Sequence, residues 1–193
     1  MRVIEFLRLT LCAAILSSAA LWAQAAPGEF SIRCEQGTDC SNRILGLLKQ
    51  FGPDFKLVKE FPPLFGDLNG DGEEDAVLVA TGSPLGGQQE FGYKVLDPYN
   101  SYFGWGDPKV TATFESAHPG GGRHVLIIHS WKADKVKAKF VIINLPFEKL
   151  ALTRVMVKKK TAWAIGAMES SALASATFWD GKNYRWRPDY MSE

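Results

Sequence analysis

The chain reads "FGDLNGDGEEDAVLVA" at residues 65 to 80, where a polar stretch with two glycines changes abruptly into an apolar one. Oxygen-bearing side chains stand at alternate positions before that change, at Asp67, Asn69 and Asp71, and once more at Asp75. The apolar run that follows is short and rich in valine, which is typical of a buried β-strand. The stretch therefore predicts a tight loop that leads directly into a strand.

Short apolar or alternating runs, separated by Gly, Pro, Asn and Asp, continue through the rest of the chain, among them "HVLIIHSW", "KVKAKFVIINL" and "LTRVMV". This pattern predicts a mainly β (α+β) fold with an antiparallel sheet, arranged as a sandwich or as part of a propeller-like structure. Neither a long linker nor a second copy of any motif is found, so residues 26–193 are expected to form a single domain.

One short N-terminal helix is expected in "SNRILGLLKQF", with Ser41 as its N-cap and Gly52-Pro53 as its end. Residues 82–119 are rich in Gly, Pro and aromatic residues and are expected to be loops that join short strands. Near the C-terminus, Asp180-Gly181 separates two aromatic-rich runs and predicts a hairpin with a type I′ turn. In "KADKVKAKFVI", alternating lysines predict a strand with one solvent-exposed face.

Residues 1–25 have the features of a secretory signal peptide. Arg2 and Arg8 precede the apolar run "LTLCAAILSSAALWA", and "AQA" at residues 23–25 is a small-x-small cleavage site. The run is shorter than the roughly 20 residues that a bilayer core requires, so a retained membrane span is the weaker alternative. We therefore expect a periplasmic or secreted protein that starts at Ala26 and has no transmembrane segment.

Cleavage would remove two basic residues and one acidic one, which leaves 20 basic and 20 acidic side chains. This balance gives no support for nucleic-acid binding, which depends on an excess of Lys and Arg to neutralise phosphates. Two cysteines would remain, Cys34 and Cys40. Outside the cytoplasm such a pair is expected to form a disulfide; a metal-binding or redox pair is the alternative, although the spacing is not Cys-x-x-Cys.

Counted from Asp67 as position 1, residues 67–75 offer side-chain oxygens at positions 1, 3, 5 and 9. Glu73 at position 7 offers a backbone carbonyl. Calcium takes six to eight such oxygen ligands in a flexible geometry, and the glycines allow the loop to curl. The predicted ligands of a calcium ion are Asp67, Asn69, Asp71, Glu73 and Asp75. The alternative is a polar turn whose acidic side chains face water.

The motif Asp-x-Asn-x-Asp-Gly-x-x-Asp, formed by Asp67, Asn69, Asp71, Gly72 and Asp75 and followed by the strand "AVLV", resembles the calcium loop of FG-GAP/VCBS-type repeats. The resemblance covers less than a tenth of the chain. It implies that these residues bind calcium. A single copy does not predict a complete propeller, because closing a ring requires several blades.

The remaining residues that could bind a metal ion or a ligand form weaker patterns. His124 and His129 are expected on opposite faces of a strand, where they cannot share a metal ion, whereas His118 and His124 could converge across the loop between them. Aromatic residues gather in two segments and suit either core packing or stacking on a carbohydrate or protein ligand. They are Tyr93, Tyr99, Tyr102, Phe103 and Trp105 in the first segment, and Trp179, Tyr184 and Trp186 in the second.

Common hydrolase and nucleotide-binding motifs are not found in the sequence. We therefore expect an exported, non-enzymatic β domain that is stabilised by calcium and acts as a binding module. The alternative is a small secreted hydrolase that acts on cell-wall or carbohydrate material. Its catalytic acids would be found among Glu90, Asp97 and Asp107, near the aromatic loops.

Overall fold

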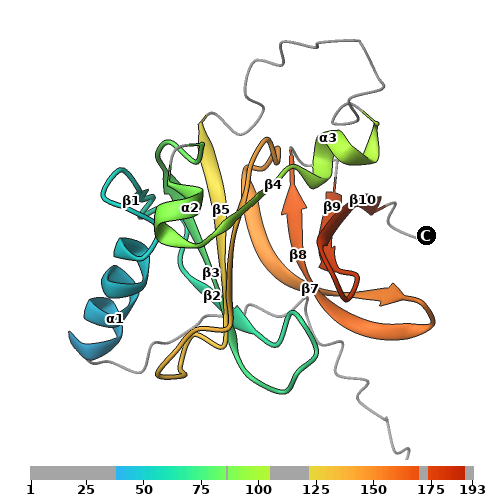
Figure 1. Cartoon of the computed structure of the whole chain (residues 1–193). Helices are drawn as coiled ribbons and strands as arrows, with labels where there is room; N and C mark the ends of the chain where they lie inside the picture. The colour runs from blue at the N-terminus through green and yellow to red at the C-terminus, as the bar shows by residue number, and fades with distance from the viewer. Residues whose placement is uncertain (1–37, 86, 105–121, 170–173, 190–193) are drawn as a thin grey trace, which may run out of the picture.

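A computed structural model describes residues 38–85, 87–104, 122–169 and 174–189 of the chain. The predicted signal peptide, Cys34, Trp105, Asp107 and His118 lie outside these ranges, as does the side chain of Cys40. The described residues form three layers, in which a helix, a six-stranded sheet and a four-stranded sheet follow one another (Figure 1). The mainly β fold expected from the sequence is therefore confirmed.

The six-stranded sheet has the order β1-β3-β5-β6-β4, and β2 also pairs with β3. Its strands are β1 (Lys56–Leu57), β2 (Leu64–Gly66), β3 (Asp75–Thr81), β4 (Lys94–Leu96), β5 (Arg123–His129) and β6 (Ala138–Ile142). All pairs are antiparallel except β4 with β6, which is parallel. The parallel pair was not expected from the sequence.

The four-stranded sheet is an antiparallel meander in the order β10-β9-β8-β7. Its strands are β7 (Lys149–Val157), β8 (Lys160–Met168), β9 (Ala174–Trp179) and β10 (Tyr184–Asp189). The two sheets pack on each other, since one buried cluster contains Val77 and Val125 from the first sheet and Ile165 and Trp186 from the second. Of the expected arrangements, this is the sandwich.

Helix α1 (Thr38–Lys49) covers the other face of the six-stranded sheet. Val77 and Val79 of β3 point into the core between the sheets, whereas Leu78 packs with Leu48 in the core under the helix. Because β3 is covered on both faces, its residues are apolar without alternation, as is typical of a central strand. This explains the abrupt change to the uninterrupted apolar run "AVLVA".

Two expectations about helices need correction. Helix α1 begins at Thr38, so Ser41 lies within its first turn and is not the N-cap; it ends before Gly52, whose φ is +114°. The region expected to contain only loops and strands also holds two short helices, α2 (Gln88–Phe91) and α3 (Pro98–Tyr102). Helix α3 begins where the Asp97 carboxylate accepts a hydrogen bond from the amide of Asn100, a local N-cap.

The solvent-exposed strand face predicted from the alternating lysines is also wrong. Strand β6 begins only at Ala138, so Lys135 and Lys137 lie in the preceding turn. Lys139 lies on the face that α1 covers, where its ammonium donates to the carbonyl oxygens of Gln50 and Phe91. A long side chain can thus pass along an apolar face and still place its charge among polar atoms.

Candidate metal loop

The loop between β2 and β3 folds around the carboxylate of Asp67. One oxygen of Asp67 accepts hydrogen bonds from the amides of Gly70 (2.7 Å) and Asp71 (3.1 Å), and the other accepts from the amide of Gly72 (2.9 Å). Gly70 and Gly72 have φ values of +77° and +85°, which favour glycine. The two glycines therefore let three consecutive backbone N–H groups point at one carboxylate.

Asn69 and Asp71 converge on the same point. The amide of Asp71, which contacts Asp67, also donates to Asn69 Oδ1 at 2.9 Å, and Asn69 Nδ2 donates to Asp71 Oδ2 at 3.0 Å. Oxygens of Asp67 and Asn69 are thus both within about 3 Å of one backbone nitrogen. The other oxygen of Asp71 accepts from the amide of Glu73 at 2.9 Å. Three of the predicted side-chain ligands are therefore brought together.

Asp75 lies beneath the loop and is fully buried. Its Oδ2 accepts from the amides of Leu68 (2.9 Å) and Asn69 (3.3 Å), and its Oδ1 accepts from the amide of Ser130 (2.9 Å). Burial raises the pKa of this carboxyl to about 6, outweighing the three backbone hydrogen bonds that lower it. Asp75 therefore joins the base of the loop to the turn that follows β5.

The turn after β5 contacts the loop along its other side. Ser130 has a φ of +57°, which turns the chain sharply, and the Trp131 amide then donates to the carbonyl of Glu74. The indole Nε1 of Trp131 donates to Glu74 Oε2 at 2.9 Å, and Lys132 forms an ion pair with the same oxygen at 2.8 Å. Arg43 of α1 donates to the carbonyls of Trp131 and Lys132, so the turn is fixed from both sides.

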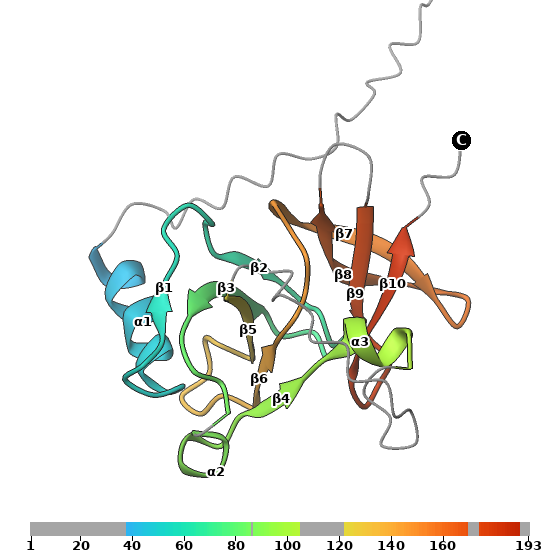
Figure 2. The same ribbon diagram turned by 90° about the horizontal axis from the view of Figure 1, so that it is seen from above.

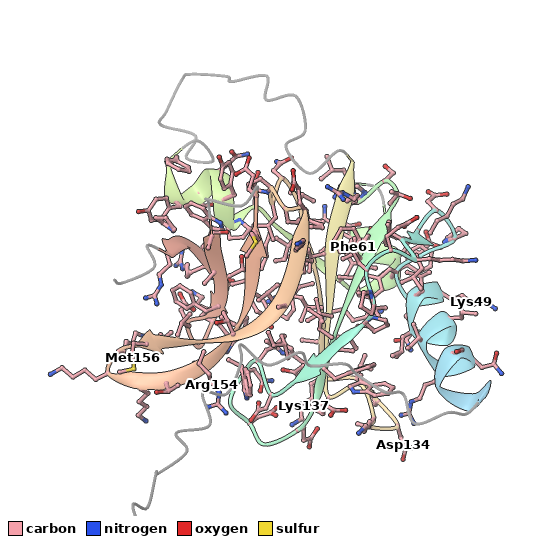
Figure 3. The ribbon with its side chains drawn as sticks, turned by 180° about the vertical axis from the view of Figure 1, so that it is seen from behind. Lys49, Phe61, Asp134, Lys137, Arg154 and Met156 are labelled. Atoms are coloured by element: carbon pink, nitrogen blue, oxygen red, sulfur yellow. The ribbon has the colours of Figure 1, made fainter. Side chains whose placement is uncertain are left out.

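Lys137 places its ammonium directly against the loop. Its Nζ lies 2.9 Å from Asp71 Oδ2 and 3.3 Å from Glu73 Oε1 (Figure 3). Desolvation is the largest single influence on Asp71 and raises its pKa, but hydrogen bonds from Lys137, the Glu73 amide and Asn69 together lower the pKa below its usual value. The Ser130 side chain and Lys137 lower the pKa of Glu73. These acids are therefore ionised at neutral pH.

The donors that residues 67–75 offer are carboxylate, amide and carbonyl oxygens, without His or Cys, and such oxygens are the ligands that calcium prefers. Among the described residues, no group of three or more His, Cys, Asp or Glu side chains lies close enough to hold a metal ion. Calcium also accepts amide oxygens, backbone carbonyls and water, and Asn69 and Glu73 offer two of these. The Glu73 carbonyl accepts no backbone hydrogen bond within the described residues. Asp75, whose two oxygens already bind backbone amides, is the least available of the predicted ligands.

The other candidate groups do not assemble into a second site. His124 bonds the carbonyl of Gly82 on one face of β5, whereas His129 is buried on the other face, where its Nε2 lies 2.8 Å from the Tyr184 hydroxyl. The expectation that these histidines lie on opposite faces of a strand is confirmed. Burial lowers the pKa of His129 to about 4.

The structure describes two of the three acids that were predicted for the hydrolase alternative. Glu90 is exposed on α2, and Asp97 is held by Asn100 and by Asn144, whose Nδ2 donates at 2.6 Å. Asp107 lies outside the described residues.

Most of the aromatic residues pack in the core, and a few reach the surface. Trp179 and Tyr184 surround His129 between the sheets, and Tyr93 packs under α1. Helix α3 lies at one end of the four-stranded sheet (Figure 2), where Tyr102 and Phe103 are 52% and 45% exposed and contact Trp186 beneath them. These two rings form the aromatic surface of α3.

Comparison of the chain with protein-family models, curated proteins and solved structures found no match. The helices were also compared with the length and hydropathy that a membrane span requires. In the part of the chain that the structure describes, every helix is too short or too polar to cross a bilayer.

Proposed function

We propose that this chain is an exported β domain in which residues 67–75 bind one structural calcium ion, and that the domain acts as a binding module. The observation that carries the proposal is that oxygens of Asp67 and Asn69 converge on the backbone amide of Asp71, while the Asp71 carboxylate bonds the Asn69 side chain. Oxygens already gathered in this way need little rearrangement to surround an ion, which reduces the cost of ordering them on binding.

Calcium in this position would link elements that are distant in sequence. The loop closes the β2–β3 hairpin, and through Asp75 and Glu74 it holds the turn after β5. Leu68, which is 2% exposed, anchors the loop in the core between the sheets. An ion that stiffens the loop would therefore stabilise the contact between β3, β5 and the second sheet.

The ligand of the binding module is proposed to contact the aromatic surface of α3. Exposed rings such as Tyr102 and Phe103 provide area for stacking on a sugar or on an apolar side chain at a small entropic cost. Co-sedimentation with insoluble cell-wall polysaccharide tests this part, using Tyr102→Ser with Phe103→Ser as the variant. Loss of sedimentation in the variant supports the surface, and equal sedimentation of both proteins contradicts it.

Thermal unfolding with calcium or with chelator tests the metal loop. Extracellular calcium modules bind with dissociation constants of roughly 0.1 to 1 mM, so a few millimolar calcium should stabilise the protein by about 1 to 2 kcal/mol. For a domain of this size the melting temperature should rise by several degrees, that is roughly 2 to 4 °C per kcal/mol. The variant Asp71→Ala should remove this rise because it deletes a ligand.

Asp134→Ala is the matched control, since it removes the same charge from the neighbouring exposed turn (Figure 3). It should keep the full response to calcium. Glu74→Ala is unsuitable as a control, because Glu74 bonds Trp131 and Lys132. Equal melting temperatures of the wild type in calcium and in chelator would show that the loop is only a polar turn.

A further inference from the structure

Lys137 is the cation that contacts the proposed calcium ligands in this structure. Among the described residues, Lys132 forms its ion pair with Glu74, and neither Lys132 nor Lys135 forms an ion pair with Asp71 or Glu73. The backbone amide of Lys137 donates to the carbonyl of His129 at 3.1 Å, which fixes the root of its side chain at the start of β6. Lys137 is therefore held in position to face the loop.

We infer that Lys137 is a built-in competitor of calcium: its ammonium pairs with Asp71 and Glu73 in the calcium-free protein and leaves them when the ion binds. The inference rests on the function proposed above and concerns the regulation of the same site. Its basis is geometric, because Asp71 Oδ2 cannot lie 2.9 Å from an ammonium and also coordinate a divalent cation without bringing two positive charges close together.

Release of Lys137 does not require the surrounding turn to move. The turn stays attached through the Ser130 amide, the Trp131 amide and Arg43, none of which involves Lys137. The side chain of Lys137 is half exposed and carries four methylene groups, so it can rotate into water at little cost. The exchange is therefore a local replacement of one cation by another.

This competition predicts opposite effects of removing the lysine in the two states. Without calcium, Lys137→Met leaves Asp71 and Glu73 without their counter-charge, so the melting temperature in chelator should fall slightly. With calcium, the ion no longer has to displace an ammonium, so its affinity should increase about three- to tenfold. A lysine with a purely structural role would instead lower stability equally in both states.

Isothermal titration with calcium alone, combined with melting temperatures in chelator, tests this on the full mature chain. The matched control is Lys135→Met, which removes the same charge from the same exposed turn and loses no ion pair within the described residues. It corrects for the general effect of net charge on cation binding. Lys137→Arg keeps the charge and should keep the affinity near that of the wild type.

A dissociation constant of Lys137→Met at least threefold lower than that of Lys135→Met supports the inference. Equal affinities of the two variants overturn it and leave the calcium loop intact. If neither the wild type nor Lys137→Met releases or absorbs heat with calcium up to 10 mM, roughly ten times the weakest constant expected of an extracellular site, the calcium loop itself is wrong and the competition fails with it.

Discussion

Asp75 begins β3 after the metal loop and Asp180 directly follows β9, and the pKa values of the two acids move in opposite directions. Both accept backbone hydrogen bonds within a turn, Asp75 from Leu68 and Asn69, and Asp180 from Lys182 and Asn183. Burial raises the pKa of Asp75 to about 6, whereas Arg185 at 2.8 Å and the turn amides lower that of Asp180 to about 2. Similar backbone hydrogen bonds thus accompany opposite pKa shifts, because Asp75 is buried whereas Asp180 is partly exposed and lies beside a guanidinium.

The partners of the two acids also differ in their distance along the chain. Among the described residues, every group that bonds the Asp180 carboxylate lies within five residues of it. Asp75 also receives the amide of Ser130, which lies 55 residues further on. The carboxylate of Asp180 is therefore held by its own turn, with only the Asp180 carbonyl reached from elsewhere, by Lys158, whereas the carboxylate of Asp75 also depends on the turn after β5.

The largest expected effect comes from deleting each carboxylate in turn. Asp75→Ala leaves three amides without their acceptor, two of these bonds being fully buried, and should destabilise the protein by about 3 kcal/mol. Asp180→Ala affects exposed groups and should cost about 1 kcal/mol. Urea unfolding of both variants at pH 7 gives the comparison. Equal losses of unfolding free energy in the two variants would mean that burial of Asp75 does not increase the contribution of its hydrogen bonds to stability.

The second effect is the dependence of the unfolding free energy on pH, to which Asp75 and His129 contribute in opposite directions. The folded pKa of Asp75, about 6, exceeds its unfolded value of 3.8, so this group adds stability as the pH falls through 6. The folded pKa of His129, about 4, is below its unfolded value of 6.5, so this group loses stability as the pH falls through 6.5. In the wild type the two contributions largely cancel.

Substitution should reveal each contribution separately. Between pH 7 and pH 5, Asp75→Asn should lose about 2 kcal/mol of stability, because only the His129 contribution remains. His129→Gln should instead gain about 1 kcal/mol over the same range, because only the Asp75 contribution remains. Unfolding free energies from urea titrations at the two pH values provide the measurement. Parallel pH profiles of the wild type and both variants would contradict the assignment.

The smallest effect concerns the two hairpin turns of the four-stranded sheet. The type I′ turn was predicted at Asp180-Gly181, but Trp179 pairs with Tyr184 and neither Asp180 nor Lys182 has a positive φ. That hairpin is confirmed with a longer connection. A two-residue turn in the left-handed conformation occurs instead between β7 and β8, at Lys158 (φ +49°) and Lys159 (φ +67°).

Lysine is a poor residue for a left-handed turn, so Lys158→Asn with Lys159→Gly should stabilise the protein by about 1 kcal/mol. Lys182→Gly is the matched control. It makes a similar change in the other turn, at a residue without positive φ, and should be neutral or mildly destabilising because of the added flexibility of the unfolded chain. Melting temperatures of the two variants should therefore move apart.

Several features followed from the sequence because their causes are local. Three such features are the end of α1 shortly before Gly52-Pro53, the terminal hairpin, and the alternation that separates His124 from His129; all depend on residues close together in the chain. The spacing of the side-chain oxygens in residues 67–75 is likewise a local feature. The contacts of Asp67 with the amides of Gly70, Asp71 and Gly72 span at most five residues.

The parts that only the tertiary structure decided depend on partners from distant segments. The sequence predicted Lys137 on the exposed face of a strand, whereas the fold places its ammonium against Asp71, which lies 66 residues earlier in the chain. The sequence also predicted Asp75 and Asp71 as equivalent calcium ligands, although Asp75 lies in the core and Asp71 at the surface. Spacing fixes which side chains can converge within a loop, but burial and the nearest opposite charge are set by packing, and these determine how each acid behaves.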